Sequence, residues 1–514
     1  MEKKHKILII LIAFMVLLVG QEGWCTLQYM DGKFTVNGFL QSQFRLHIGG
    51  QNPNNNQFRP LSEGNHKVNM FRNMLQLELN YAASDTFSLF SKIKYINESS
   101  GGLDSNLRQY EAFPLEYPGD LKLEDDDNMA QIQELYADLT MGPLWLRLGK
   151  QQVSWGQTDG FRLLDVINPL DLSWRLIFDA MYEGHDNVRE SLWMVRANYN
   201  IPCITFVDNP QLELLILPGK FVGDQLASDG APYNVLPTVV KVHEEQPDGP
   251  EVGVKLSGIW KRAEITLNYF RAHSDYGVYL VPGTVVFDRT WGVPLAGDII
   301  PPAGIGREDL MRLNAYGHHP LMSHIGFSFN YDESSFTKGV YRFEFLYEPD
   351  KPYERGITIP GIGSFTNAMI EKLGTVKYCL GIDRPFWLRA LNPRRTFGFG
   401  FQVFQRFVVE GKDKLDENII TLSGGHKVQT LTTTFTLSLD TQYKQDRIHP
   451  ILFFAWDPRG GFWLAPQCEF QYGDHWRFYL LGTWVGGEDR NAANDGLGGL
   501  YWWDELMFRV TYQF

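Results

Sequence analysis

Between positions 155 and 171, charged and amide residues stand within an apolar stretch, which is unusual for a connecting segment. They stand among apolar residues such as Leu163, Leu164 and Ile167, which a segment in free contact with water would not carry in such number. Charged and amide side chains held in this way could act on a solute through charge and hydrogen bonding. The candidates are Trp155, Asp159, Arg162, Asp165, Asn168 and Asp171.

The elements that must position these residues show a strict alternation of apolar and polar side chains. In the final stretch, 505–514, one face carries Leu506, Phe508 and Val510 and the other carries polar residues such as Arg509. A period of two is typical of a strand with one apolar and one polar face. Similar stretches recur for nine or ten residues at a time, the length that a tilted strand needs to cross a bilayer.

These stretches predict a transmembrane antiparallel up-and-down β-barrel of about 18 strands, within a range of 16–18. The last strand is expected to close the barrel against the strand Phe34 to His47, because a sheet in lipid cannot leave an edge unpaired. Strands are expected near 33–47, 67–82, 86–96, 130–140, 144–154, 191–199, 211–217, 251–260, 262–272, 322–331, 340–348, 375–384, 396–409, 431–443, 449–457, 462–472, 475–485 and 505–514.

The connections between these strands alternate in length, as they do in outer-membrane barrels. The connections on the inward side are expected to be short: 83–85, 141–143, 200–210, 261, 332–339, 385–395, 444–448 and 473–474. The outward connections are expected to be long, apart from 458–461: 48–66, 97–129, 155–190, 218–250, 273–321, 349–374, 410–430 and 486–504. A soluble sandwich would not separate its loops in this way.

The amino terminus and the net charge indicate where the protein is located and which partners it does not have. Lys3, Lys4 and Lys6 precede an apolar run from Ile7 to Val19, which predicts that residues 1–25 are a secretory signal peptide. The remainder, 26–514, shows no linker and is expected to form one barrel domain. The net charge of −13 becomes −14 without residues 1–25, which carry three Lys and two Glu. A negative chain of this size argues against nucleic acid as a partner.

The segment 155–190 has two overlapping interpretations. It could be a loop that folds into the barrel mouth and packs there, with Asp165 or Asp171 capping a short helix. It could also be a constriction or gate, with Asp159, Arg162, Asp165 and Asp171 facing the pore. An inward-folded loop narrows the passage in either case.

The polar faces of the strands are expected to line the lumen with charges of both signs. Mixed charges can satisfy one another across neighbouring strands, so the sequence gives no support for a strongly anion- or cation-selective pore. The lumen-facing charges of main interest are Arg147, Arg196, Arg342, Glu344, Arg406 and Arg509.

No enzyme, metal or cofactor site is expected. His318, His319 and His324 lack the spacing of a known metal site, and no Gly-x-Ser-x-Gly motif or phosphate-binding loop is present. Without a recognisable catalytic site, the sequence does not predict an enzyme.

Two stretches resemble known proteins. A strand that ends in Gly149-Lys150-Gln151, then Trp155-Gly156, Asp159-Gly160 and Asn168-Pro169-Leu170-Asp171, resembles the best-marked region of the Gram-negative outer-membrane family called domain of unknown function 1302. The resemblance is specific over residues 145–175. It implies a β-barrel in the outer membrane of a Gram-negative bacterium, and an exporter or channel for hydrophobic or polymeric compounds. The terminal Phe514 resembles the aromatic residue that the barrel-assembly machinery reads.

The expected function is a channel that passes a solute or a hydrophobic, lipid-like compound passively and is narrowed by the 155–190 loop. An alternative is a barrel sheath around a partner protein, such as a cytochrome or an export lipoprotein. A membrane lipid hydrolase is a third hypothesis with less support. The expected partners are outer-membrane lipid, the barrel-assembly machinery and a periplasmic or lipoprotein partner.

Overall fold

The structure is a computed structural model. It describes residues 26–49, 68–98, 121–124, 128–172, 185–202, 206–219, 221–225, 240–244, 247–275, 278–280, 313–359, 363–409, 419–421, 426–487, 497 and 504–514. The expected signal peptide, 1–25, and the part 173–184 of the 155–190 loop lie outside these residues.

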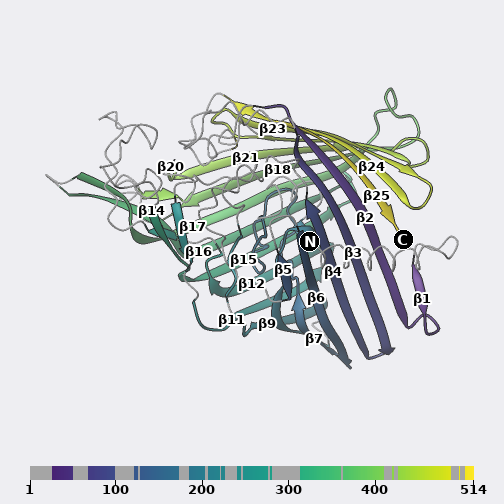
Figure 1. Ribbon diagram of the computed structural model, residues 1–514, viewed down its shortest axis with the longest axis horizontal. Coiled ribbons are helices and arrows are strands. Elements are labelled where there is room, and N and C mark those ends of the chain that lie inside the picture. The colour runs from purple at the N-terminus through teal and green to yellow at the C-terminus, as the bar shows by residue number, and fades with distance from the viewer. Residues whose placement is uncertain are drawn as a thin grey trace, which may run out of the picture.

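Eighteen of the described strands form one closed antiparallel ring (Figure 1). Each strand pairs with the barrel strand before it in the chain, and the last pairs with the first, so the predicted fold and strand number are confirmed. In ring order they are β2 (Phe34–His47), β3 (Val68–Ser84), β4 (Phe87–Glu98), β6 (Asn128–Met141), β7 (Leu144–Gln151), β8 (Leu192–Asn200), β9 (Asp208–Leu217), β11 (Glu251–Trp260), β12 (Ala263–His273), β15 (Leu321–Glu333), β16 (Gly339–Ile359), β17 (Gly363–Phe386), β18 (Phe397–Val408), β21 (Leu431–Asp440), β22 (Ile448–Trp456), β23 (Gly461–Tyr472), β24 (Trp476–Gly487) and β25 (Glu505–Gln513).

Alternate connections lie at opposite ends of an antiparallel barrel, and here the two ends differ as expected. At one end, no connection between the barrel strands is longer than ten residues: 85–86, 142–143, 201–207, 261–262, 334–338, 387–396, 441–447 and 473–475. We call this the short-turn end. The other end carries the segment 152–191 between β7 and β8 and other long connections.

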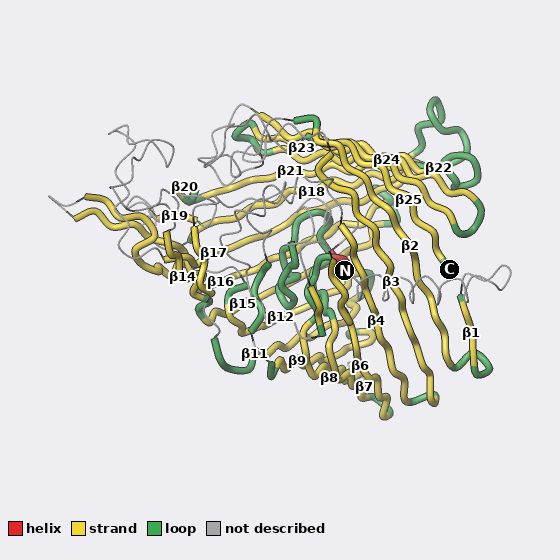
Figure 2. Tube along the Cα trace, viewed as in Figure 1, coloured by secondary structure: helices red, strands yellow, loops and turns green. Residues whose placement is uncertain are grey.

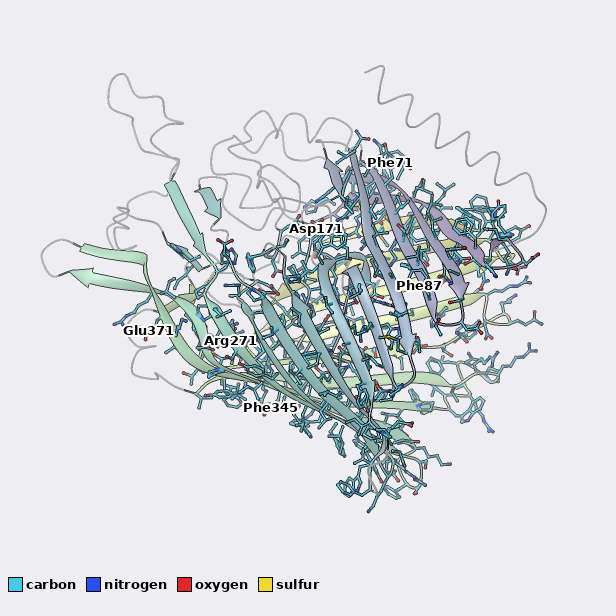
Figure 3. The ribbon with its side chains drawn as sticks, turned by 90° about the horizontal axis from the view of Figure 1, so that it is seen from below. Phe71, Phe87, Asp171, Arg271, Phe345 and Glu371 are labelled. Carbon is cyan, nitrogen blue, oxygen red and sulfur yellow. The ribbon has the colours of Figure 1, made fainter. Side chains whose placement is uncertain are left out.

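The prediction of a long loop at 349–374 is wrong. β16 and β17 continue through this region as one hairpin, which reaches past the other strands at the left of Figure 1 and carries Glu371 in Figure 3. Pro352 and several charged residues break the apolar alternation there. The strands absorb the irregularity through shifts of register after Glu348 and after Arg355.

Short strands outside the barrel ring were not predicted. β10 (Val240–Glu244), β13 (Val278–Leu280) and β14 (Leu313–His318) form a separate sheet. β10 belongs to the connection between β9 and β11, and the other two strands belong to the connection between β12 and β15. The other short strands pair with barrel strands or with one another: β1 (Leu27–Tyr29), β5 (Lys122–Glu124), β19 (Ile419–Thr421) and β20 (His426–Lys427). Strands of two to six residues are too short for an alternation to stand out.

The outer face of the barrel is apolar. Val252, Val254 and Leu256 of β11 are about two-fifths exposed, as are Phe71 of β3 and Phe87 of β4 (Figure 3). An apolar exterior is what lipid around a barrel requires. No helix among the described residues is long and apolar enough to cross a membrane.

The ring closes at a seam between β2 and β25. Nine pairs, from Phe39 with Gln513 to His47 with Glu505, join the two strands, and Gly38 and Phe514 exchange two backbone hydrogen bonds of 3.0 Å. At the start of β2, before the pairing with β25 begins, β1 pairs with β2 and takes the place of β25. A Cβ atom on Gly38 would lie 2.9 Å from the Phe514 ring and would overlap the Gln76 carbonyl oxygen.

Replacing Gly38 with valine should therefore impair closure of the barrel, because the added side chain enters the space of the Phe514 ring and the neighbouring strand. The test is gel migration of the full chain with and without boiling, since closed barrels migrate differently until heated. We expect Gly38→Val to lose the heat-modifiable band and Phe514→Ala to reduce its yield. Gly219→Ala, just after β9, is the control, because this glycine does not have a positive φ and the added Cβ would meet only Trp193, at 3.9 Å. A normal yield from Gly38→Val would contradict the role of this contact.

Candidate functional site

The segment between β7 and β8 crosses the inside of the barrel. Trp155 contacts β9 and β12, Phe161 contacts β18, and Gly160 lies against Phe453 of β22. In the described ring β22 is ten strands from β7 in one direction and eight in the other. A segment can reach opposite sides of a ring only through its interior. We call residues 152–172 and 185–190 the inner segment; Figure 2 shows its described parts among the green loops within the ring of strands.

Trp155 fixes the base of the inner segment. Its side chain is 3% exposed and packs with Phe270 and Leu215 in a buried apolar cluster. The indole Nε1 donates to Glu213 Oε1 at 2.7 Å. The ring lies against Gly253 of β11, where any Cβ would come within 2.8 Å of it. A wall glycine thus makes room for the tryptophan.

Asn168 ties the two ends of the inner segment together. The side chain is fully buried. Its Oδ1 accepts the Val153 N–H at 2.7 Å, and its Nδ2 donates to the carbonyls of Glu190 at 2.8 Å and Gln151 at 3.3 Å. Both the departure from β7 and the approach to β8 therefore depend on one amide.

Asp165 is buried within the inner segment, where it pairs with two arginines. Its side chain is 6% exposed and accepts hydrogen bonds from Arg189 at 2.6 and 2.9 Å, with Arg162 at 3.2 Å. Arg162 also donates to the Asn168 carbonyl at 2.5 Å. The expectation that Asp165 faces the pore is corrected by this burial, since a carboxylate among two guanidinium groups inside the segment stabilises the segment itself.

The tip of the inner segment presents charge to the lumen. Asp159 is 65% exposed and forms an ion pair with Arg342 of β16. Arg342 also pairs with Asp383 of β17 at 2.6 Å, and Gln402 of β18 donates to Asp159 at 2.8 Å. Arg342 and Gln402, from two wall strands, therefore hold one exposed carboxylate in place, and Asp383 from a third strand binds the arginine.

A second wall carboxylate receives the backbone of the segment. Glu344 of β16 is almost fully buried, and it accepts the N–H groups of Gln157 and Leu164, the latter at 3.3 Å. Phe161 packs edge to face on Phe404 of β18 with ring centroids 5.4 Å apart. Polar and aromatic contacts together hold the tip against the wall.

Asp171 of the inner segment lies towards the end of the barrel that carries the long connections, and Figure 3 labels it. It pairs with Gln225 in a short bridge and lies 3.4 Å from Lys122. Next to it, Asp224 accepts the Leu170 N–H at 2.6 Å. Burial raises the pKa of the Asp224 carboxyl, although Arg162 opposes the shift. Burial, reinforced by Asp224, also raises the pKa of Asp275 well above its usual range.

The other charges of interest lie on lumen-facing positions of the wall. Arg147 pairs with Asp138 and Arg196 with Glu213, while Arg509 lies over the Tyr479 ring at 4.0 Å. Arg406 stands opposite Lys377 and Thr432 in the register of β17, β18 and β21. The structure thus brings Arg342 and Glu344 to the inner segment and leaves the remaining four arginines on the wall.

Several functional partners were not singled out in the sequence. Gln402 and Glu213 of the wall bind the inner segment directly, through Asp159 and Trp155. Asp383 binds the Arg342 that pairs with Asp159, and the backbone N–H of Gln157 in the segment donates to Glu344. All of these contacts join residues far apart in the chain. A polar residue on an alternating strand gives no sign of which loop it will meet. Within the described part of the chain, no group of three or more His, Cys, Asp or Glu side chains could hold a metal ion.

Comparison with known proteins gives one family. The sequence model of the family described as "Protein of unknown function (DUF1302)" matches residues 47–514. No curated protein matches the chain.

Solved structures with a similar arrangement are outer-membrane proteins and porins of low sequence identity. Acinetobacter baumannii OccAB3 is 9% identical with a TM-score of 0.48, covering 94% of this chain and 99% of that one. A BenF-like porin from Pseudomonas fluorescens Pf-5 is also 9% identical with a TM-score of 0.48, covering 93% and 98%. Salmonella typhi OmpF, in a complex with daunomycin, is 8% identical with a TM-score of 0.39, covering 95% and 100%. The assignment of the barrel rests on the continuous strand pairing described above.

Proposed function

The chain belongs to the family DUF1302, and we propose that it is a passive channel in the outer membrane of a Gram-negative bacterium, narrowed by its inner segment. The observation that carries the proposal is the position of Asp159. It is a carboxylate 65% exposed inside a closed ring of strands, held there by Arg342 and Gln402.

An exposed charge in the interior supports a water-filled passage, because an ionised carboxylate away from water costs several kcal/mol. Barrels of 16–18 strands are wide enough to leave an aqueous channel. The inner segment occupies part of this width, and its tip places Asp159 and Asp383 beside the remaining path. A solute that crosses this channel would therefore pass the carboxylates of Asp159 and Asp383.

The test is single-channel current from the refolded protein in a planar bilayer with a salt gradient. We expect steady conductance, and we expect Asp159→Asn to shift the reversal potential towards a smaller preference for cations because one exposed negative charge is lost. The matched control is Asp446→Asn, which removes the carboxylate of an equally close ion pair, with Arg395, in a short turn outside the lumen.

A protein that folds into the bilayer but carries no current would contradict the channel. That result would favour a sheath around a partner protein. A reversal potential that Asp159→Asn and Asp446→Asn leave equally unchanged would contradict the role of the inner segment's tip.

A further inference from the structure

Five flat side chains lie next to one another on the lumen wall of β4, β6, β7 and β8. Phe90 stacks on Tyr136 with ring centroids 4.9 Å apart and an interplanar angle of 25°. The Arg147 guanidinium lies 3.7 Å from the Tyr136 ring and 5.0 Å from the Trp145 ring. The Arg196 guanidinium lies 5.4 Å from the same Trp145 ring. We call these residues the stacking ladder.

The two guanidinium groups of the ladder have their edges occupied. Arg147 donates to both oxygens of Asp138, at 2.7 and 2.9 Å, and Arg196 donates to Glu213 at 2.8 Å. A guanidinium whose edge is bound to a carboxylate still offers its flat faces for stacking. The two ion pairs also cancel the charge, so the ladder attracts a ligand through its faces more than through net charge.

The ladder is accessible from the lumen. The side chains of Arg147, Asp138 and Arg196 are 20%, 21% and 21% exposed, and Tyr136 and Trp145 are half-buried. All of them lie on the polar face of their strands, whose opposite face carries exposed residues such as Leu148 and Val195. A solute in the barrel can therefore reach the exposed parts of these side chains.

The ladder is joined to the base of the inner segment through one carboxylate. Glu213 accepts the Arg196 guanidinium through Oε2 and the Trp155 indole through Oε1. The ladder thus lies beside the point where the inner segment leaves the wall. A solute held on the ladder would be close to the narrowed part of the passage.

We propose that the stacking ladder is a binding site for planar aromatic solutes, including aromatic carboxylates. The proposal rests on the proposed channel and names a class of solute for it. The flat groups of the ladder already lie against one another, so a planar solute would lengthen the stack by adding one more flat face to it, through the aromatic and cation–π contacts that hold the ladder itself. A saturated ring of the same size and charge cannot stack in this way.

The experiment measures binding in detergent micelles by fluorine NMR, with 4-fluorobenzoate as the probe and the full folded chain as the protein. We expect line broadening that benzoate reverses and that cyclohexanecarboxylate, equal in charge but not planar, leaves unchanged. Arg147→Lys keeps the positive charge beside Asp138 but removes the flat face. We expect this variant and Trp145→Ala each to weaken binding about tenfold, which corresponds to about 1.4 kcal/mol.

The matched control is Trp193→Ala on β8, which removes a tryptophan from the outer face and should leave binding unchanged. Equal broadening by the wild type and Arg147→Lys would overturn the proposal, as would equal displacement by the saturated acid or no broadening by the wild type. Because no current is measured, the outcomes separate the two proposals. A protein that binds but does not conduct refutes only the channel, and one that conducts but does not bind refutes only the ladder site.

Discussion

Deleting residues 161–185 should give a closed barrel that carries several times the current of the full chain. The deletion removes Phe161, Leu164 and Asn168, which pack the inner segment against the wall or join its ends. Without them the residues left between β7 and β8 cannot stay across the lumen, and the passage widens. The measurement is single-channel conductance in planar bilayers, with heat-modifiable migration as proof that the barrel has closed.

Glu344→Ala is the companion variant, because it loosens the same segment without shortening the chain. It removes the acceptor of the Gln157 and Leu164 N–H groups. We expect a smaller rise in current and more frequent fluctuations. If the deletion variant closes into a barrel and conducts as the full chain does, the inner segment does not limit the path.

Asn168→Ala should release the inner segment while the barrel stays folded. The substitution leaves the Val153 N–H and the carbonyls of Gln151 and Glu190 without their side-chain partner in a fully buried site. Each buried group left in this state costs about 1–3 kcal/mol, so the local stability of the segment falls by several kcal/mol. The measurement is hydrogen exchange of the backbone amides between 151 and 172.

Asn198→Ala is the control for this substitution. Asn198 is also a lumen-facing asparagine, but its side chain makes a long bond of 3.4 Å to Gln211 and lies outside the inner segment. We expect faster exchange within 151–172 only for Asn168→Ala, together with noisier current. The same exchange pattern in both variants would show that Asn168 does not hold the segment.

The barrel was predictable because each of its strands carries its own signal. The alternation of Leu431, Thr433, Phe435 and the residues between them marks one strand without reference to any other. The hairpin at 349–374 failed this test since Pro352 and its charged neighbours interrupt the period. Pairing with the adjacent strand, which a single stretch of sequence does not reveal, decided the structure there.

The inner segment was predictable in location but not in detail. Its apolar composition indicated that 155–171 would be covered, and the structure packs Leu164 and Ile167 in buried clusters. Composition does not separate the buried Asp165 from the exposed Asp159, because their environments depend on Arg189, at the far end of the inner segment, and on Arg342 of the wall. Contacts between residues far apart in the sequence decide which charged side chains a solute can meet.

The seam between β2 and β25 sets the order in which the chain can reach its final state. It joins Phe39 to Gln513 and His47 to Glu505, so nearly the whole chain lies within the loop that it closes. The entropy of closing such a loop grows only slowly with its length, but contacts this distant in sequence form late and slow folding. Until they form, two strand edges stay open to any other extended chain. The lifetime of that open ring, more than the stability of the finished barrel, should therefore govern losses to aggregation.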